Sequence, residues 1–238
     1  MIRSILVALF LLIYLIVSLP IQLVELIIRR FNPDFSNKTS LAFVRFGLRV
    51  VTLISGVKLK VDGEENIPDD RAALFVANHC GFFDIVVTYP LTKRLTGYVA
   101  KKEIKKVPIL SWWMYFTNCI FLDRQDPRNG LKAVLAAADL AKNGISVFLF
   151  PEGTRSKDGK LHEFKEGGMK IATKSGCPII PVGITGTADV LENHFPIIKP
   201  AKVTVSFGKP IETEGLSRAE QRELASLVHS EVAALISK

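Results

Sequence analysis

Short apolar runs that alternate with helical segments constrain the fold of this chain more than any other feature. The clearest run, residues 72–77, is short and partly β-branched or aromatic, as a buried strand is. Similar runs predict strands near residues 57–61, 98–100, 119–122, 145–150, 178–182 and 203–207. Helices are expected at residues 109–116 and 131–142 and before Ser175, and a capping box at Ser217–Glu220 opens a last one. This alternation is typical of an α/β domain with a mostly parallel sheet flanked by helices.

The first 56 residues form a different kind of segment, and we place the start of the α/β domain, residues 57–238, after them. Nearly every residue from 5 to 19 is apolar, and the helical pattern can continue to residue 28. Such a helix would be about 36 Å long at 1.5 Å per residue, which is enough to cross a bilayer. Pro20 is expected to bend it.

The second half of this first helix carries a narrow polar stripe. Gln22, Glu25 and Arg29 recur at helical spacing on an otherwise apolar surface. A second apolar helix, expected at residues 39–54, carries a similar stripe that includes Arg45. A pair between Glu25 and Arg45 or Arg49 would hide charge from lipid.

We therefore interpret residues 1–56 as a membrane-embedded two-helix motif in the cytoplasmic leaflet. A single spanning helix is an alternative, and Arg29 and Arg30 would then favour a cytoplasmic C-terminal side. A cleaved signal peptide is disfavoured because no small-x-small cleavage site follows the apolar run. Both membrane interpretations place the α/β domain in the cytosol, at the cytoplasmic face of an inner membrane.

The chain is both basic and apolar, with a formal net charge of +8 and 48% hydrophobic residues. This combination favours membrane lipids or phosphate-bearing ligands as partners. It has no basic arm, zinc pattern or aromatic–glycine repeat, so nucleic acid is not expected as a partner. Its 3 cysteines are widely spaced, which is typical of reduced thiols. Its 4 histidines lack metal-ligand spacing, so no metal site is predicted.

His79 and Asp84 are the strongest candidates for chemistry. His79 follows the predicted strand at residues 72–77, and Asp84 begins the next helix as a first-turn acid. A turn at Gly81 can bring the carboxylate back to the imidazole. An Asp bonded to one ring nitrogen fixes the tautomer and leaves the other nitrogen free to take a proton. The alternative is a capping Asp beside an unrelated loop histidine, and the pair alone does not decide between them.

Charged side chains follow several other predicted strands. Lys101 and Lys102 follow one strand, Arg124 follows the next, and Glu152 and Arg155 follow another. Any one cation would ordinarily be a solvated surface charge. Their recurrence at successive strand ends predicts a phosphate pocket, where Arg offers two parallel donors and Lys a point charge. Glu152 could orient an arginine or accept a hydrogen bond from a substrate hydroxyl.

Four sequence blocks occur in a characteristic order: Asn78-His79-x4-Asp84, then residues 120–124, 150–156 and 180–182. Together they resemble the blocks of the glycerophospholipid acyltransferase family, and most closely those of its bacterial 1-acyl-sn-glycerol-3-phosphate acyltransferases. The resemblance covers about residues 57–207, and the N-terminal helix pair also looks like the membrane motif of bacterial members. One departure is Asn118, where members often have glycine; we expect it to tune packing without removing activity.

The resemblance implies direct acyl transfer from an acyl thioester, acyl-CoA or acyl carrier protein, to the sn-2 hydroxyl of lysophosphatidic acid, which gives phosphatidic acid without a cofactor. His79 would be the general base and Asp84 its orienting partner. No oxyanion donor can be identified from the sequence, and the backbone amides near Gly81 are our own guess. The acceptor phosphate and glycerol would contact Lys101 (or Lys102 if the helix phase differs), Arg124, Glu152, Gly153, Thr154 and Arg155.

Two other functions remain open at this stage. A relative in the same family could use glycerol-3-phosphate or a lysophospholipid with a larger head group as acceptor. A protein of a different class could keep the fold and bind anionic lipid without catalysis. Intact His79 and Asp84 argue against the second alternative.

Overall fold

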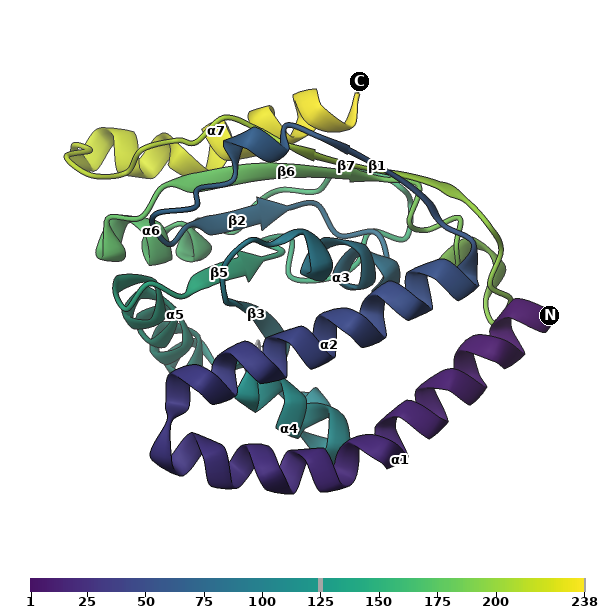
Figure 1. The fold of residues 1–238 in the computed structure, drawn as a ribbon. Helices are drawn as coiled ribbons and strands as arrows, with labels where there is room; N and C mark the ends of the chain where they lie inside the picture. Colours follow the sequence, from purple (N-terminus) through teal and green to yellow (C-terminus); the bar gives the residue numbers. More distant parts are fainter. Residues whose placement is uncertain (124–125, 238) are drawn as a thin grey trace.

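The computed structural model describes residues 1–123 and 126–237 (Figure 1). Its centre is one sheet with the strand order β1-β7-β6-β2-β5-β3-β4. Neighbouring strands run parallel except β6 and β7, which are antiparallel. The prediction of a mostly parallel sheet flanked by helices is confirmed. The strands are β1 (Lys58–Asp62), β2 (Leu74–Ala77), β3 (Thr96–Lys101), β4 (Ile120–Leu122), β5 (Ser146–Leu149), β6 (Ile179–Thr185) and β7 (Lys202–Phe207).

Helices cover both faces of this sheet, so its central strands are apolar on both sides. Side chains alternate along a strand. Phe75 therefore packs into the core under α2 (Pro33–Ser55) and α3 (Phe82–Thr88). Leu74 and Val76 pack into the second core. That core lies under α5 (Pro127–Lys142), α6 (Lys170–Ser175) and α7 (Arg218–Ile236). Ser217 and Glu220 form the predicted capping box of α7.

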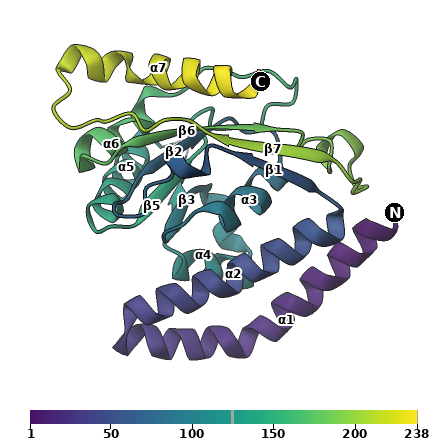
Figure 2. The ribbon, with the colours of Figure 1, turned by 45° about the horizontal axis from the view of Figure 1, so that its top comes forward.

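The first two helices lie side by side, across the sheet from α7 (Figure 2). α1 (Ile2–Phe31) is longer than expected and is long and apolar enough to cross a membrane. It changes direction part-way along its length in Figure 1, and Pro20 lies inside it. Asn32 separates α1 from α2, and its side chain accepts a hydrogen bond from the backbone N–H of Phe35.

The polar stripe of α1 faces α4 (Pro108–Phe116). Gln22 Nε2 donates to the carbonyl of Ile109 at 2.8 Å. Ser18 Oγ accepts a hydrogen bond of 3.0 Å from Trp113 Nε1. These contacts satisfy polar groups on an apolar helix and fix α4 against it.

The expected ion pair of Glu25 with Arg45 or Arg49 does not form among the described residues, so that prediction is wrong. Arg45 donates to the carbonyl of Thr92 instead. Glu25 is buried, and the described part of the chain places no cation in ion-pair contact with it. The two stripes do not meet because α4 packs against both helices.

Both ends of α1 are tied to later parts of the chain. Near its start, Arg3 Nη1 donates to the carbonyl of Ile54 at 2.8 Å, and Ser4 Oγ accepts from the backbone N–H of Ile198 at 2.8 Å. Near its end, Arg29 Nη1 donates to the carbonyl of Phe116 at 3.3 Å. Near its start the helix is therefore bound to both α2 and the α/β domain, and near its end to the α/β domain.

Asn118 adopts the left-handed conformation, with a φ of 59°. This conformation favours glycine and, less strongly, asparagine, which explains why an asparagine fits at this position. The side chain also gains contacts that glycine would lack: Nδ2 donates to Asn37 Oδ1 at 3.3 Å, and Oδ1 accepts from Arg29 Nη2 at 3.4 Å. Asn118 therefore connects the loop before β4 to both N-terminal helices.

We expect Asn118→Val to lower the free energy of unfolding by about 1–2 kcal/mol, because a β-branched residue is strained at positive φ. Asn118→Gly keeps the backbone conformation and loses only the side-chain contacts, so it serves as the matched control. Chemical denaturation in detergent measures both. Equal stability of the two variants would show that the backbone conformation does not limit this position.

Candidate active site

His79 and Asp84 meet at the carboxyl end of β2. His79 Nδ1 lies 2.7 Å from Asp84 Oδ2, and the two side chains are 14% and 0% exposed. The extended backbone of Gly81 reverses the chain between them and caps α3. A Cβ at Gly81 would lie 2.3 Å from Glu192 Oε2, so a larger residue here would have to displace that carboxylate.

The Asp84 carboxylate is held by three further donors. Oδ2 accepts from the backbone N–H groups of Cys80 at 2.7 Å and Gly81 at 2.8 Å. Oδ1 accepts from the hydroxyl of buried Thr187. The carboxylate therefore has one fixed orientation toward the imidazole. The N–H of Phe82 donates to Glu192 Oε1 at 2.7 Å, so the amides of Cys80, Gly81 and Phe82 all have acceptors and are not free to bind an oxyanion, which was our guess.

The imidazole of His79 is also fixed by its surroundings. Its ring stacks on Phe150, with 4.2 Å between the ring centroids and 21° between the planes. Its backbone carbonyl accepts from the N–H of Ser156 at 2.7 Å. Within the described residues, Nε2 makes no hydrogen bond. The arrangement leaves one ring nitrogen able to accept a proton.

Glu152 holds the backbone around His79. Its Oε1 accepts from the N–H of His79 at 2.7 Å, and its Oε2 accepts from the N–H of His162 at 3.2 Å. Burial raises the pKa of the Glu152 carboxyl, although these two hydrogen bonds oppose the shift. Glu152 therefore does not orient an arginine, as the sequence had suggested. Gly153 follows with a φ of 76°, which favours glycine.

Arg155 reaches the turn that carries the His–Asp pair. Its Nη1 lies 3.3 Å from Glu192 Oε1, and its guanidinium carbon lies 4.1 Å from the ring centroid of Phe82. The Arg155 side chain is 40% exposed, so part of the guanidinium faces solvent. A cation therefore stands next to the candidate base.

The other predicted phosphate ligands are placed differently. Lys101 Nζ lies 3.4 Å from Glu103 Oε1, and Lys102 Nζ lies 2.5 Å from Asp123 Oδ2. Neither lysine contacts the His79 cluster in the described chain. Thr154 is exposed beside Gly153. Arg124 lies outside the described residues. The structure thus brings together His79, Asp84, Glu152 and Arg155 and leaves the lysines paired with neighbouring acids.

Sequence reasoning missed Phe150 as the ring under His79, Thr187 as the donor to Asp84, and Glu192 as the partner of Arg155 and Phe82. One signal could have found Thr187. It follows β6, which pairs with β2 in parallel, so the carboxyl ends of these two strands meet. Glu192 lies further along the same loop and gave no comparable signal.

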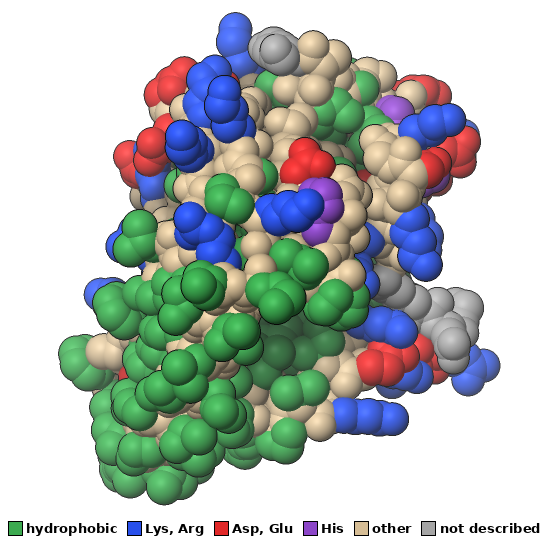
Figure 3. All heavy atoms as spheres, turned by 90° about the vertical axis from the view of Figure 1, so that its right-hand side faces the viewer, with side chains coloured by type: hydrophobic (Ala, Val, Ile, Leu, Met, Phe, Trp, Pro, Cys, Tyr) green, Lys and Arg blue, Asp and Glu red, His purple; other side chains and the backbone are tan. Residues whose placement is uncertain are grey.

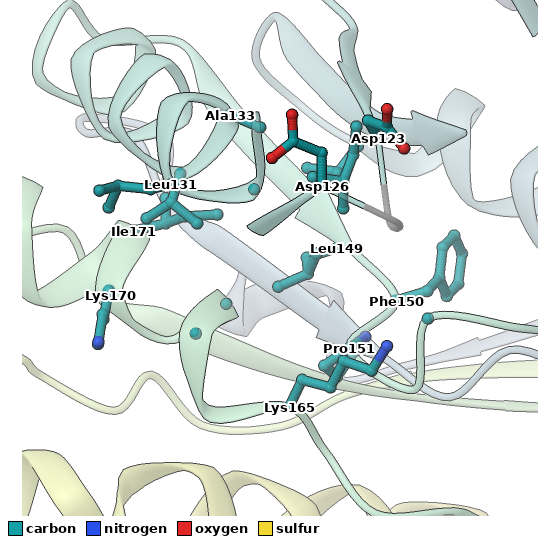
Figure 4. A pocket seen from close by; sticks show the side chains of 17 residues that line it. Asp123, Asp126, Leu131, Ala133, Leu149, Phe150, Pro151, Lys165, Lys170 and Ile171 are labelled. Atoms are coloured by element: carbon teal, nitrogen blue, oxygen red, sulfur yellow. The ribbon is translucent and has the colours of Figure 1, made fainter. Parts of the chain in front are cut away.

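An apolar cavity of about 390 Å³ lies beside the site. Phe150 lines it and also stacks on His79. Figure 4 shows Leu149 and Ile171 at its wall and Lys165 beside Pro151. Such a cavity fits an aliphatic chain better than a polar group.

Cys80 is a poor nucleophile despite its place next to His79. Burial, together with the nearby Asp84 carboxylate, raises the pKa of its thiol to about 12. The thiolate is the reactive form of cysteine, and it is scarce far below the pKa. Cys80 is therefore not a candidate nucleophile at this site.

The face at the carboxyl ends of the strands contains two kinds of surface (Figure 3). Hydrophobic side chains cover its lower part, over α1 and α2, and charged side chains gather above them. The exposed hydrophobic residues of α1 include Leu9, Leu12, Ile16, Leu23 and Ile27. A single long apolar helix with this exposure indicates membrane association.

The Acyltransferase family model matches residues 58–185, which is more than half of the chain. The chain belongs to this acyltransferase family. A crystal structure of the 1-acyl-sn-glycerophosphate acyltransferase from Thermotoga maritima superposes with a TM-score of 0.79 and 27% identity. The match covers 99% of this acyltransferase and 97% of that chain.

Curated relatives are also named as 1-acyl-sn-glycerol-3-phosphate acyltransferases. This acyltransferase is 37% identical over 156 residues to a chloroplastic 1-acyl-sn-glycerol-3-phosphate acyltransferase of Arabidopsis thaliana, covering 65% of this chain and 44% of the relative. It is 26% identical over 195 residues to the 1-acyl-sn-glycerol-3-phosphate acyltransferase of Borreliella burgdorferi, covering 82% and 78%. The chain spans less than half the length of the chloroplastic relatives.

Proposed function

We propose that this acyltransferase moves an acyl group from an acyl thioester to the sn-2 hydroxyl of 1-acyl-glycerol-3-phosphate. The observation that carries the proposal is the 2.7 Å contact between His79 Nδ1 and Asp84 Oδ2, which leaves Nε2 available as a base. The activity for which these relatives are named supports the choice of acceptor.

In the proposed reaction, His79 Nε2 takes the proton of the acceptor hydroxyl as that oxygen attacks the thioester carbonyl. Asp84 keeps the other ring nitrogen protonated and stabilises the imidazolium that forms. The tetrahedral intermediate then collapses, the carbon–sulfur bond breaks, and the thiolate takes the proton from the imidazolium. The products are phosphatidic acid and a free thiol. Positioning and proton transfer carry most of the catalysis, because a thiolate is already a good leaving group.

The cavity beside Phe150 is the candidate site for the acyl chain of the donor. Its apolar lining and its position behind the imidazole would place the thioester carbonyl near His79. Both acyl-CoA and acyl carrier protein are anionic, and the basic chain suits either donor.

The acceptor phosphate is expected to bind Arg155, which lies beside the His79 turn and keeps part of its guanidinium exposed. Arg155→Ala should raise the Michaelis constant for lysophosphatidic acid about tenfold or more, because a charge-assisted hydrogen bond is lost. Steady-state kinetics at saturating donor measures this. Turnover at saturating acceptor should fall less.

The matched control is Arg71→Ala, which removes another arginine paired with a glutamate, Glu212, just before β2 begins. That position is at the amino end of the strand, so the Michaelis constant should not change. An unchanged constant in Arg155→Ala as well would remove Arg155 from the phosphate site.

The proposed membrane arrangement places α1 in one leaflet. A helix that crosses the bilayer separates its ends by about 30 Å of hydrocarbon. The contacts of Arg3 with Ile54 and of Arg29 with Phe116 would then have to form on opposite sides of the membrane. Helices α1 and α2 lying along a single leaflet, with the catalytic domain in the cytosol, satisfy both contacts.

Free-thiol release from an acyl thioester tests the reaction. Purified protein in lipid would be assayed with lysophosphatidic acid, glycerol-3-phosphate and lysophosphatidylcholine in parallel, with both acyl-CoA and acyl carrier protein as donor. Release only with lysophosphatidic acid supports the proposal. Release with another acceptor keeps the chemistry and changes the substrate, and no release with any acceptor points to a lipid-binding protein without catalysis.

A further inference from the structure

The outer face of α4 carries aromatic side chains that are open to solvent. Pro108, Trp112 and Tyr115 are spaced so that they lie on one side of the helix. Trp112 is 46% and Tyr115 52% exposed, and their ring centroids are 6.1 Å apart. Val107, 49% exposed, precedes the helix. A pair of contacting aromatic rings on an open helix face is typical of an interaction surface.

This face adjoins the apolar surface of α1. Trp113 and Ile109, on the inner side of α4, bond to Ser18 and Gln22 of α1. The guanidinium carbon of Arg29 also lies 4.8 Å from the ring centroid of Tyr115. The second half of α1 exposes Leu23, Val24, Leu26 and Ile27. The aromatic face therefore continues the apolar surface of α1. The hydrogen bonds between the two helices fix the position of this face relative to α1.

Positive charge gathers where α4 begins. Lys105 and Lys106 directly precede Val107 and are exposed. Unlike Lys101 and Lys102, they form no ion pair with any described carboxylate. With Lys102 and Lys132 they line an open hollow of about 720 Å³, which also contains Glu103 and Asp123. Both lysines thus border the apolar and aromatic face, and Lys105 Nζ also lies 5.1 Å from the ring centroid of Phe121.

These properties match the surface of an anionic bilayer. Trp and Tyr prefer the head-group level of a membrane, where one end of the ring system is apolar and the other is hydrated. Lysines beside an apolar face are attracted to anionic lipid head groups. We propose that α4 and the Lys105–Lys106 pair form a second membrane contact, which docks on anionic phospholipid with Trp112 and Tyr115 among the head groups.

This proposal rests on the proposed attachment of α1 and α2 to the membrane. It adds a second point of attachment. If only α1 and α2 touched the membrane, the whole molecule could tilt about the long axis of this helix pair. Contact through α4 fixes the tilt, because α4 is bonded to α1 and lies directly before β4 of the sheet. The candidate site would then keep one orientation toward the leaflet that supplies the acceptor.

Tryptophan fluorescence tests the contact in the full chain, which contains 2 tryptophans, Trp112 and Trp113. Trp113 is buried, whereas Trp112 is exposed, so Trp112→Phe removes the surface probe with little effect on folding. Protein on vesicles of phosphatidylcholine and phosphatidylglycerol would be quenched by phospholipid brominated near the head group. We expect clear quenching in the unaltered protein and a loss of most of it in Trp112→Phe.

The outcomes separate the contact from the attachment. Vesicle-bound protein that is quenched equally with and without Trp112, or not quenched, would overturn the α4 contact and leave the attachment by α1 and α2 intact. Protein that does not bind vesicles would overturn both. Quenching that depends on Trp112 supports both.

The charge is tested with Lys105→Gln/Lys106→Gln. Its partition onto phosphatidylglycerol vesicles should fall about fivefold for each lysine removed, and the loss should vanish on uncharged vesicles. The control, Arg218→Gln/Arg222→Gln, removes two exposed charges from α7 on the opposite side of the molecule and should partition normally (Figure 2). Unchanged partition of the lysine variant, together with slower transfer from acyl carrier protein, would assign the lysines to a carrier and overturn the lipid assignment.

Discussion

Replacement of His79 by alanine is expected to lower turnover about a hundredfold or more while the protein stays folded and bound to membranes. The reason is that Nε2 of His79 is the group proposed to take the hydroxyl proton, and the other ring nitrogen is already bonded to Asp84. The ring stacks on Phe150 and bonds to Asp84, and after its removal the Asp84 carboxylate keeps its hydrogen bonds from Cys80, Gly81 and Thr187, so the fold should survive. Thiol release under saturating substrates measures the effect.

His162→Ala provides the comparison within the same chain. Its ring pairs with Asp158 at 3.0 Å, is 49% exposed, and has no place in the proposed reaction. Turnover of this variant should stay within a few-fold of normal. If His79→Ala keeps near-normal turnover, or if both variants lose the same amount, His79 is not the general base.

The Asp84 variants are expected to separate catalysis from folding. In Asp84→Asn the amide oxygen can still accept from His79, and the Thr187 hydroxyl can turn to accept from the new amide group. The fold should therefore survive, but the imidazolium loses its negative partner. We expect turnover to fall on the order of a hundredfold, measured as thiol release, with a melting temperature near normal.

Asp84→Ala should lose stability as well as turnover. It leaves the N–H groups of Cys80 and Gly81 without their acceptor, which costs about 1–3 kcal/mol for each group that stays buried. Denaturation of both variants in detergent shows the difference. Normal turnover in Asp84→Asn would mean that Asp84 only caps α3, which is the plainer interpretation of its position.

The sequence predicted the parts of the site that depend on short-range geometry. His79 and Asp84 are five residues apart across a strand, a turn and a helix start, so their contact follows from local structure. The same reasoning placed the strand ends at one edge of a mostly parallel sheet. The roles of the individual site residues remain predictions until the variants are measured.

The contacts that could not be predicted join distant segments. Thr187 lies 103 residues from Asp84, and Glu192 lies 110 residues from Phe82. Their arrival depends on the place of β6 beside β2 and on the path of the loop that follows β6. The expected pair of Glu25 and Arg45 failed for a similar reason, because α4 comes from a distant part of the chain and occupies the stripe of α1.

Local charge pairing was a second source of error. Lys101 and Lys102 follow a strand as predicted, but each has an acid within reach, Glu103 and Asp123. The end of a strand fixes the backbone position of a lysine or arginine. The nearest carboxylate then determines where the charged group of that side chain lies. Arg155 also has such a partner, yet Glu192 holds it beside the His79 turn.

The pairing of the first strand with the last has a consequence for any shortened form of the chain. β1 lies at the edge of the sheet and is hydrogen-bonded to β7, which ends at residue 207. The segment matched by the family, residues 58–185, contains β1 without β7. An expression fragment cut at those limits would expose two unpaired strand edges, those of β1 and β6, which invite aggregation. During synthesis, likewise, β1 cannot pair with β7 until almost the whole chain has left the ribosome.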